Sequence, residues 1–440
     1  MAVNPGSPLL LPRLDIAALE DFALDVSTKG LPFGTEGMRL GDIGKQGWHV
    51  FDGSLPTPLA VLKRDVIDAN SRWMSRFAQI NGLVIAPHGK TTMAPQLYDR
   101  QIADGAWAIT EATGHQVAVA MRYGVKRILL ANQPVSRDTV DTCFRALHAP
   151  YDTELYCLAD SLEGVALLAE GARRNPPPDG NPLRVLVEIG FVGGRTGARE
   201  QDTAIAVARA VGEVPGLTLA GFECFEGVLP NTKEVDAFLD KLVAACLAAD
   251  EMGILPKAGP IVLSAGGSSF FDRVGERFAA VSIKQPLLKV LRSGCYLVHD
   301  VRGYATAFQR ILGETKLPLP EGGLEPALEV WAHVQSRPEK KRAILTLGKR
   351  DIGHDSGLPT PMVWIRPGAM KKPEPIPEGH VSDALNDQHC HMVLPEDSPL
   401  QVGDMVGFGI GHPCTTFDKW QLLMLVDADY RVIGGIKTFF

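Results

Sequence analysis

The sequence contains no apolar run long enough to cross a membrane, because a helical span needs roughly 18 or more consecutive apolar residues. Its first residues lack the basic start and long apolar core of a secretion signal. Positive charge is not in excess either, since 44 Lys and Arg stand against 51 Asp and Glu, for a formal net charge of −7. Without a basic stretch, the sequence does not predict nucleic-acid binding. We therefore expect a cytoplasmic protein that binds neither membrane nor nucleic acid.

Cysteine is scarce and shows no pairing pattern. The sequence has 7 cysteines, an odd number, at wide spacing and without a Cys-x-x-Cys motif. This excludes the disulfide framework of a small secreted domain. Most of these cysteines are expected to be small buried apolar residues, and Cys414 is the exception discussed below.

The middle of the chain alternates short apolar strands with segments of helical periodicity. Strands separated by helices pair in parallel through right-handed crossovers. Eight such strands predict a closed (β/α)8 barrel of the α/β class, and a doubly wound open sheet is the alternative. Helices are also expected over 14–24 and 59–77, and a first strand over 49–55. The eight barrel strands are expected at 83–86, 107–110, 127–131, 153–158, 184–189, 217–222, 261–264 and 287–291.

After residue 310 the composition and the periodicity of the sequence change. Prolines and glycines multiply and helical periodicity disappears, which predicts an antiparallel β domain after the barrel. The domains are then an N-terminal extension (1–48), the barrel (49–311) and the β domain (312–440). Strands of the β domain are expected at 328–335, 343–347, 361–365, 389–394, 404–409, 422–426 and 432–440.

One lysine stands at the end of the first barrel strand. His88 and Lys90 follow a proline directly after the apolar run, where a βα loop begins. Barrel enzymes carry out their chemistry at this end of the strands. Lysine is also the side chain that forms a Schiff base with an aldehyde cofactor. An ordinary solvated lysine in a turn is the simpler interpretation, and the other strand ends help to decide between the two.

Two loops rich in glycine and serine follow the last two barrel strands. Gly266, Gly267 and Ser268 come after the seventh strand, and the segment with Gly294 and Tyr296 comes after the eighth. Backbone N–H groups of such loops can approach an anion closely, and barrels often bind phosphate here. Each loop alone could be a tight turn. Together with a lysine across the mouth, they predict pyridoxal phosphate bound covalently to Lys90.

Arg195 follows the fifth strand. A guanidinium is always charged, so beside the pyridine nitrogen it would keep that nitrogen unprotonated. This role is predicted for Arg195, and the alternative is an arginine that pairs with a loop carboxylate.

A possible metal pair lies far along the sequence. His412 and Cys414 are separated by one residue, and in an extended segment such residues share one face. Imidazole and thiolate together suit Zn²⁺, and two protein ligands leave positions open for water or substrate. A buried cysteine beside a surface histidine is the simpler interpretation. His389 and His391 form a second pair with the same spacing, ranked below the first.

These segments together resemble a known family. The run 88–92 has the sequence His-Gly-Lys-Thr-Thr and resembles the His-x-Lys-Thr-His signature around the pyridoxal lysine of D-threonine aldolases and D-serine dehydratases, except that Thr92 replaces the final histidine. The segment 188–197 is similar to the family's strand-five segment with its arginine, although the loop is longer. The loops at 264–269 and 292–296 are similar to its phosphate loops. Asp387, Gln388 and His389 are similar to its Glu-Glu-His segment, and His412 with Cys414 resembles its metal pair.

The resemblance implies an alanine-racemase-like barrel, a β domain and a metal beside the cofactor. Dehydratases of the family use His and Cys for zinc and its aldolases more often His and Asp, so Cys414 favours a D-serine dehydratase or related D-3-hydroxyamino acid dehydratase. The alternatives are a D-threonine aldolase and a non-catalytic pyridoxal-phosphate-binding protein, although such carriers lack a β domain. Related folds also imply a homodimer acting on a small D-amino acid.

Overall fold

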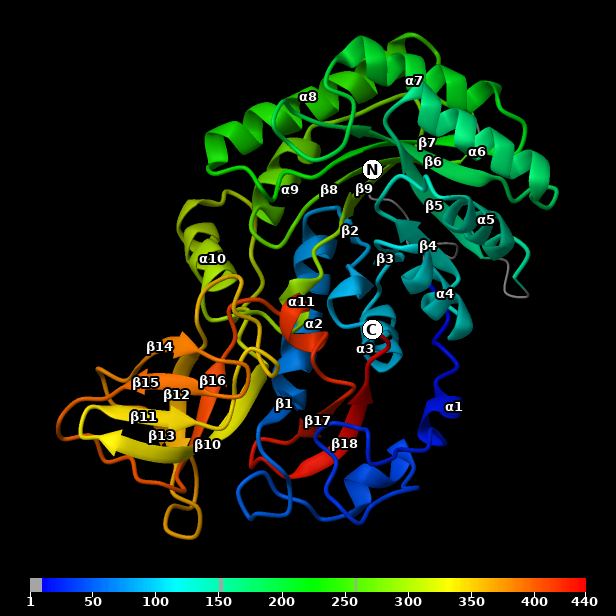
Figure 1. The fold of residues 1–440 in the computed structure, drawn as a ribbon. Coiled ribbons are helices and arrows are strands. Elements are labelled where there is room, and N and C mark those ends of the chain that lie inside the picture. Colours follow the sequence, from blue (N-terminus) through cyan, green and yellow to red (C-terminus); the bar gives the residue numbers. More distant parts are fainter. Residues whose placement is uncertain (1–9, 150–152, 258) are drawn as a thin grey trace.

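The computed structural model describes residues 10–149, 153–257 and 259–440, and within them the strands form one eight-stranded and one ten-stranded sheet. Figure 1 shows a barrel surrounded by helices above a separate β domain. The predicted α/β class with a barrel followed by an antiparallel β domain is therefore confirmed.

All eight expected barrel strands are present, and each pairs with its neighbour in parallel. The sheet order is β2-β9-β8-β7-β6-β5-β4-β3. The open-sheet alternative is wrong because the two end strands also meet: Trp107 N donates to Ile85 O at 2.7 Å and Thr110 N to Pro87 O at 2.9 Å. The strands are β2 (Val84–Ile85), β3 (Ile109–Glu111), β4 (Arg127–Leu130), β5 (Glu154–Ala159), β6 (Leu183–Ile189), β7 (Leu217–Cys224), β8 (Ile261–Ala265) and β9 (Leu287–Leu291).

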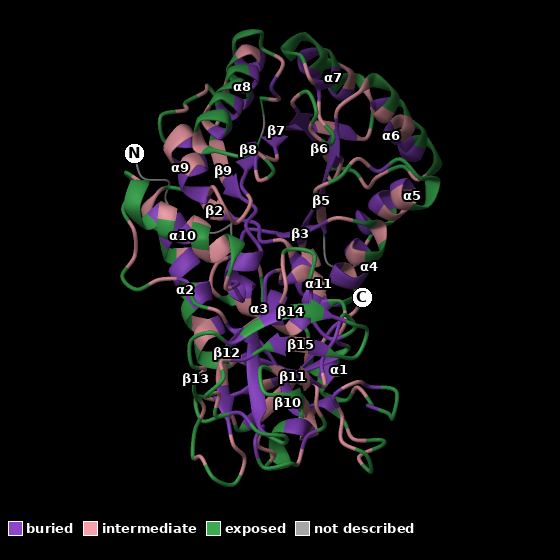
Figure 2. Ribbon diagram, turned by 60° about the vertical axis from the view of Figure 1, so that its left-hand side comes forward, coloured by how far each residue is buried: buried purple, intermediate pink, exposed green. Residues whose placement is uncertain are grey.

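Helices cover the outside of the barrel. Their outer faces are exposed, whereas the strands beneath them are buried (Figure 2). Several begin at side chains that cap the first turn, as Ser161 does by accepting from Gly164 N. The sequence prediction omitted α5, α9 and α10. The helices are α2 (Arg64–Ile80), α3 (Pro95–Ala103), α4 (Gly114–Arg122), α5 (Arg137–Ala146), α6 (Leu162–Arg174), α7 (Gln201–Glu213), α8 (Thr232–Glu251), α9 (Phe271–Ala279) and α10 (Gly303–Glu314). None of the described helices is long and apolar enough to span a bilayer.

The ten-stranded sheet includes one strand, β1 (Leu59–Lys63), that precedes the barrel in sequence. β1 pairs antiparallel with β10 and parallel with β17, so the helix expected over 59–77 is wrong for its first five residues. Pairing on both sides explains why an apolar run of helical spacing is extended here. The other strands are β10 (Leu328–Glu339), β11 (Arg342–Leu345), β12 (Thr360–Ile365), β13 (Glu374–Pro375), β14 (Val381–Leu385), β15 (Cys390–Val393), β16 (Met405–Gly409), β17 (Leu422–Val426) and β18 (Val432–Lys437).

The segment before β1 has little regular structure. The helix expected over 14–24 shrinks to α1 (Ala17–Glu20), and the strand expected over 49–55 is a turn with one bridge between His49 and Arg431. Buried apolar side chains such as Leu19 and Leu24 nevertheless pack against the β domain. Contacts with the β-domain core, more than local periodicity, order this part of the chain.

A buried carboxylate fixes the N-terminal segment to the barrel. Asp99 of α3 is 3 % exposed, pairs with Arg13 and accepts from Leu14 N at 2.9 Å. Burial opposes the charge, but the bonds from Arg13 and Leu14 N outweigh burial and lower the pKa of Asp99. The stability it contributes is therefore present above the ordinary carboxyl pKa and is lost as pH falls through the lowered one.

We expect Asp99→Asn to cost about 1 kcal/mol of unfolding free energy at neutral pH and to speed tryptic cleavage at Arg13, because the ion pair is lost. Urea unfolding and timed proteolysis would measure both. Asp15→Asn, a change to an exposed carboxylate, should do neither, and equal proteolysis of the two variants would contradict this role of Asp99.

Candidate functional site

Lys90 lies at the barrel mouth in the short helix η2 (Gly89–Thr91), directly after β2 and His88. Residue 89 must be glycine here, because a Cβ would lie 2.4 Å from Glu111 Oε1 and 2.8 Å from Ile109 Cγ2 of β3. The Tyr98 hydroxyl of α3 donates to Gly89 O at 3.0 Å. Packing against β3 and α3 thus fixes the backbone that carries Lys90.

His88 presents a buried nitrogen beside Lys90. The ring is partly exposed, but Nδ1 is covered and has no hydrogen-bond partner among the described residues. Burial first, and then the charges of Lys90, Arg292 and Arg195, hold the pKa of His88 well below its ordinary value. The loop after β9 packs closely on this residue, because a Cβ on Gly294 would lie 2.7 Å from His88 O. A bound polar group could supply the hydrogen-bond partner that the neutral imidazole of His88 lacks.

The glycine loop after β8 already holds a carboxylate. Gly266 N and Gly267 N donate to the two oxygens of Glu226 at 3.0 and 2.9 Å, and Glu226 is 0 % exposed. Two of the backbone donors predicted to bind phosphate are therefore engaged by the protein itself. A phosphate here would rely on Ser268 and on the loop after β9.

A buried ion pair lies beneath these loops. Arg292 Nη2 lies 2.5 Å from Glu223 Oε2, and Arg292 Nη1 donates to Ser264 Oγ at 2.7 Å. Burial raises the pKa of Glu223 to about 8, against the opposing charge of Arg292. The pair joins the ends of β7, β8 and β9 below the mouth and so stabilises the floor of the site.

Two predicted residues lie differently from the others. Arg195 is exposed on the loop after β6, with its guanidinium 4.3 Å from the centre of the Phe225 ring, so an aromatic face positions it. Tyr296 is buried and its hydroxyl accepts from Gln101 of α3 at 3.1 Å. The Tyr296 hydroxyl therefore bonds a side chain of the helix layer.

His412 and Cys414 lie at the start of a helical turn. Pro413 has helical torsions and Cys414 begins α11 (Cys414–Phe417), so the expected extended geometry is wrong. The imidazole and the thiol still face each other, and His412 Nδ1 lies 2.5 Å from Asp355 Oδ2. Asp355 also accepts from Thr415 Oγ1 at 2.6 Å. A carboxylate therefore orients the ring and leaves Nε2 as the nitrogen that can bind a metal.

The β domain brings this pair to the barrel mouth. Cys414 Sγ lies 3.5 Å from Thr91 Oγ1, and Thr91 is the residue after Lys90. In Figure 1, α11 lies below the barrel, close to the end of β2. Thr91 and Cys414 are 323 positions apart in sequence, and the fold brings them into one site.

The electrostatics of the pair match a thiolate beside an imidazolium. Hydrogen bonding from Cys295 first, and from His412 and Thr91 after it, lowers the pKa of Cys414 to about 4 although burial opposes the charge. Cys414 first, and then Asp355, raise the pKa of His412 to about 9 against desolvation. A thiolate and a carboxylate-bound imidazole are a donor set that suits zinc.

No group of three or more His, Cys, Asp or Glu side chains is arranged to enclose a metal within the described ranges. His391, of the second pair, bonds Asn386 Oδ1 through Nε2 at 2.8 Å on the β domain, and His389 is exposed. His412 and Cys414 could supply two ligands and would leave the other positions to water or substrate.

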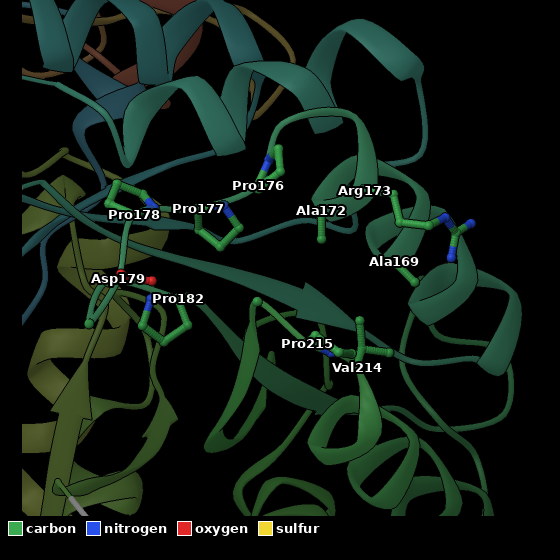
Figure 3. A pocket seen from close by; sticks show the side chains of 12 residues that line it. Ala169, Ala172, Arg173, Pro176, Pro177, Pro178, Asp179, Pro182, Val214 and Pro215 are labelled. Atoms are coloured by element: carbon green, nitrogen blue, oxygen red, sulfur yellow. The ribbon is translucent and has the colours of Figure 1, made fainter.

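A cavity of 630 Å³ lies elsewhere on the molecule. It is lined by the turns before β6 and β7, including Pro177, Pro182 and Pro215 (Figure 3). These turns are at the N-terminal ends of the strands, the end of a barrel that contributes to stability more than to chemistry. We therefore place the functional site at the mouth and not in this cavity.

Several residues of the site gave no local signal in the sequence. Asp355, Glu226 and Cys295 contact predicted residues only through the fold. The sequence did show that Cys295 follows a barrel strand, but nothing in it placed this thiol against Cys414.

Comparison with known proteins finds relatives in both sequence and fold. A family model described as "Putative serine dehydratase domain" matches residues 327–426. The chain is 23 % identical over 319 residues to the 3-hydroxy-D-aspartate aldolase of Paracoccus denitrificans (strain Pd 1222), which covers 70 % of this chain and 76 % of that one. The structure of D-threonine aldolase from Filomicrobium marinum superposes with a TM-score of 0.72 at 21 % identity, over 89 % of this chain and 97 % of that one.

D-threo-3-hydroxyaspartate dehydratase from Delftia sp. HT23 superposes with a TM-score of 0.67 at 19 % identity, over 88 % of this chain and 98 % of that one. A solved ala racemase-like protein from Idiomarina loihiensis shares the fold of a barrel joined to a β domain, with a TM-score of 0.68 at 16 % identity over 87 % of this chain and 96 % of that one. Within this class of fold, the comparisons confirm the predicted resemblance to the D-serine dehydratase and D-threonine aldolase-like family of fold-type III pyridoxal-phosphate enzymes.

Proposed function

We propose that this protein is a pyridoxal-phosphate- and zinc-dependent lyase that removes water and then ammonia from a D-3-hydroxyamino acid, with D-serine as the model substrate. The observation that carries the proposal is the contact of 3.5 Å between Cys414 Sγ and Thr91 Oγ1, next to Lys90. The lysine for the Schiff base and the two metal ligands would then lie at one mouth. The proposed elimination requires this, because the bonds that break are on the neighbouring α and β carbons of the substrate.

The residues of the mouth fit both groups. Lys90 offers the amine, and His88 offers an imidazole nitrogen that has no partner in the described part of the chain. Ser268 and the loop after β9 offer the donors for a phosphate. When bound, pyridoxal phosphate supplies an electron sink and zinc a Lewis acid that makes hydroxide a better leaving group. His412 and Cys414 would hold the zinc, with Asp355 orienting the imidazole.

The chain's own residues divide the work. Lys90 would hold the cofactor through its amine, and the same amine, when free, would serve as the base for the α-proton. Arg195 would face the pyridine nitrogen of the cofactor, and its fixed charge would keep that nitrogen unprotonated. The stacking of Arg195 on Phe225 supports a fixed orientation.

An aldolase is the second candidate, and the relatives favour it in part. Two of the compared proteins are named as aldolases and one as a dehydratase. Cysteine at position 414 supports the dehydratase, and one compared structure is a cysteine-to-alanine mutant of a D-threo-3-hydroxyaspartate dehydratase in the metal-free form. The difference lies in which bond breaks after substrate binding, Cβ–O or Cα–Cβ.

Product analysis separates the candidates. Holoenzyme with D-serine, D-threonine or a D-3-hydroxyaspartate should give the 2-oxo acid and ammonia, should lose turnover with EDTA and should regain it with Zn²⁺. Glycine and an aldehyde from D-threonine would establish the aldolase instead. A protein that binds the cofactor but converts none of these substrates would be the non-catalytic alternative.

Cys414 contacts Thr91 of the same chain, so the metal pair reaches the mouth without a second subunit. We nevertheless propose a homodimer in which the β domain of one copy approaches the barrel mouth of the other. Light scattering tests this directly, and a monomer would contradict it.

A further inference from the structure

Two thiols, one from the barrel and one from the β domain, meet at the mouth. Cys295 begins the short helix η3 (Cys295–Leu297) after β9, and Cys414 begins α11 in the β domain. Their Sγ atoms are 3.9 Å apart. Both also contact one hydroxyl, since Thr91 Oγ1 lies 3.8 Å from Cys295 Sγ and 3.5 Å from Cys414 Sγ. The two sulfurs therefore already lie at contact distance.

This pair differs from the other cysteines of the chain. Six of the seven cysteines are buried, and Cys414 alone is partly exposed. A small solute that enters the mouth can reach Cys414 first, with Cys295 directly behind it. An exposed thiol with a second thiol in contact is the usual arrangement for reversible oxidation, because the second sulfur resolves the first oxidation product.

We propose that Cys295 and Cys414 are a reversible oxidation site for a peroxide. The O–O bond of the peroxide breaks as Cys414 sulfur takes one oxygen and is oxidised to the sulfenic acid, and one water leaves. Cys295 sulfur then displaces the second water and the S–S bond forms. Two thiols lose two hydrogens and two electrons, and one hydrogen peroxide becomes two waters. The sulfurs must approach from 3.9 Å to about 2.05 Å.

The bond would have two consequences at this position. It would link the barrel loop after β9 to the β domain across the mouth. It would also prevent the sulfur of Cys414 from binding zinc. This second consequence rests on the proposed function, but formation of the disulfide itself does not.

The test uses reduced full-length protein, prepared without metal and treated with one equivalent of hydrogen peroxide. Wild type should lose two of its seven thiols, and the peptides that contain Cys295 and Cys414 should appear as one species lighter by two hydrogen atoms. Dithiothreitol should restore both thiols. Cys295→Ser should instead accumulate higher oxides of Cys414 that dithiothreitol does not reverse. Cys390→Ser, a matched change to a buried cysteine of the β domain, should behave as wild type.

The proposal is overturned if all seven thiols persist in wild type, or if Cys414 is oxidised without a link to Cys295. Repeating the reaction after Zn²⁺ loading separates this failure from failure of the proposed function. If His412 and Cys414 bind zinc, loading should slow disulfide formation at least tenfold. A disulfide that forms equally fast with and without zinc would support the oxidation site and argue against the metal pair.

Discussion

Replacing Lys90 with alanine is expected to lower turnover of D-serine by at least about 10³-fold, because the change removes both the cofactor's covalent anchor and the base for the α-proton. The visible absorbance of the lysine-bound cofactor should disappear at the same time. The fold should persist, because Gly89 and Tyr98 hold this backbone through contacts that do not involve the Lys90 side chain. Turnover, absorbance and the melting temperature measure the three effects.

The matched control is Lys126→Ala. Lys126 directly precedes β4 (Arg127–Leu130), at the opposite end of the barrel from the mouth. It should leave turnover within about twofold of wild type, since surface changes away from a site have small effects. A Lys90→Ala protein that keeps its absorbance and most of its turnover would remove Lys90 from the chemistry.

The barrel could be predicted because its physical signal is local. The centre of the run 184–189 is the apolar triplet Val185, Leu186 and Val187, as expected for a strand buried on both faces, and β6 (Leu183–Ile189) forms there. β1 could not be predicted in the same way. Its residues Leu59 to Lys63 have helical spacing, and only the strands on either side, from residues 328–339 and 422–426, make them extended.

The candidate site could be predicted where the residue types themselves limit the reactions or ligands that are possible. Lys90 at a strand end and His412 beside Cys414 are such cases, and the structure brings these segments together. Glu226 was not predictable, because its bonds to Gly266 N and Gly267 N depend on how two βα loops meet. The glycines permit a close approach by an anion, but the sequence does not say that the anion is a carboxylate of the same chain.

Replacing Cys414 with serine is expected to remove most of the bound zinc and to lower turnover by at least about 10²-fold, because a hydroxyl is a far weaker zinc ligand than a thiolate. Asp355→Asn should weaken zinc binding by about 10- to 100-fold, as loss of a carboxylate behind a histidine ligand usually does. Both changes act on His412 and Cys414 at the mouth, where Asp355 Oδ2 lies 2.5 Å from the imidazole. Metal content after dialysis and competition with a chromogenic chelator measure the affinity.

The control for the thiol is Cys390→Ser, since Cys390 is buried on β15 (Cys390–Val393) beside Ser382, its Sγ 3.6 Å from that hydroxyl. Zinc content should be unchanged in this variant. Added zinc should restore turnover to Asp355→Asn more fully than to Cys414→Ser, because the first variant keeps both ligands. Full zinc occupancy and full turnover in Cys414→Ser would mean that the metal, if the enzyme uses one, is held elsewhere.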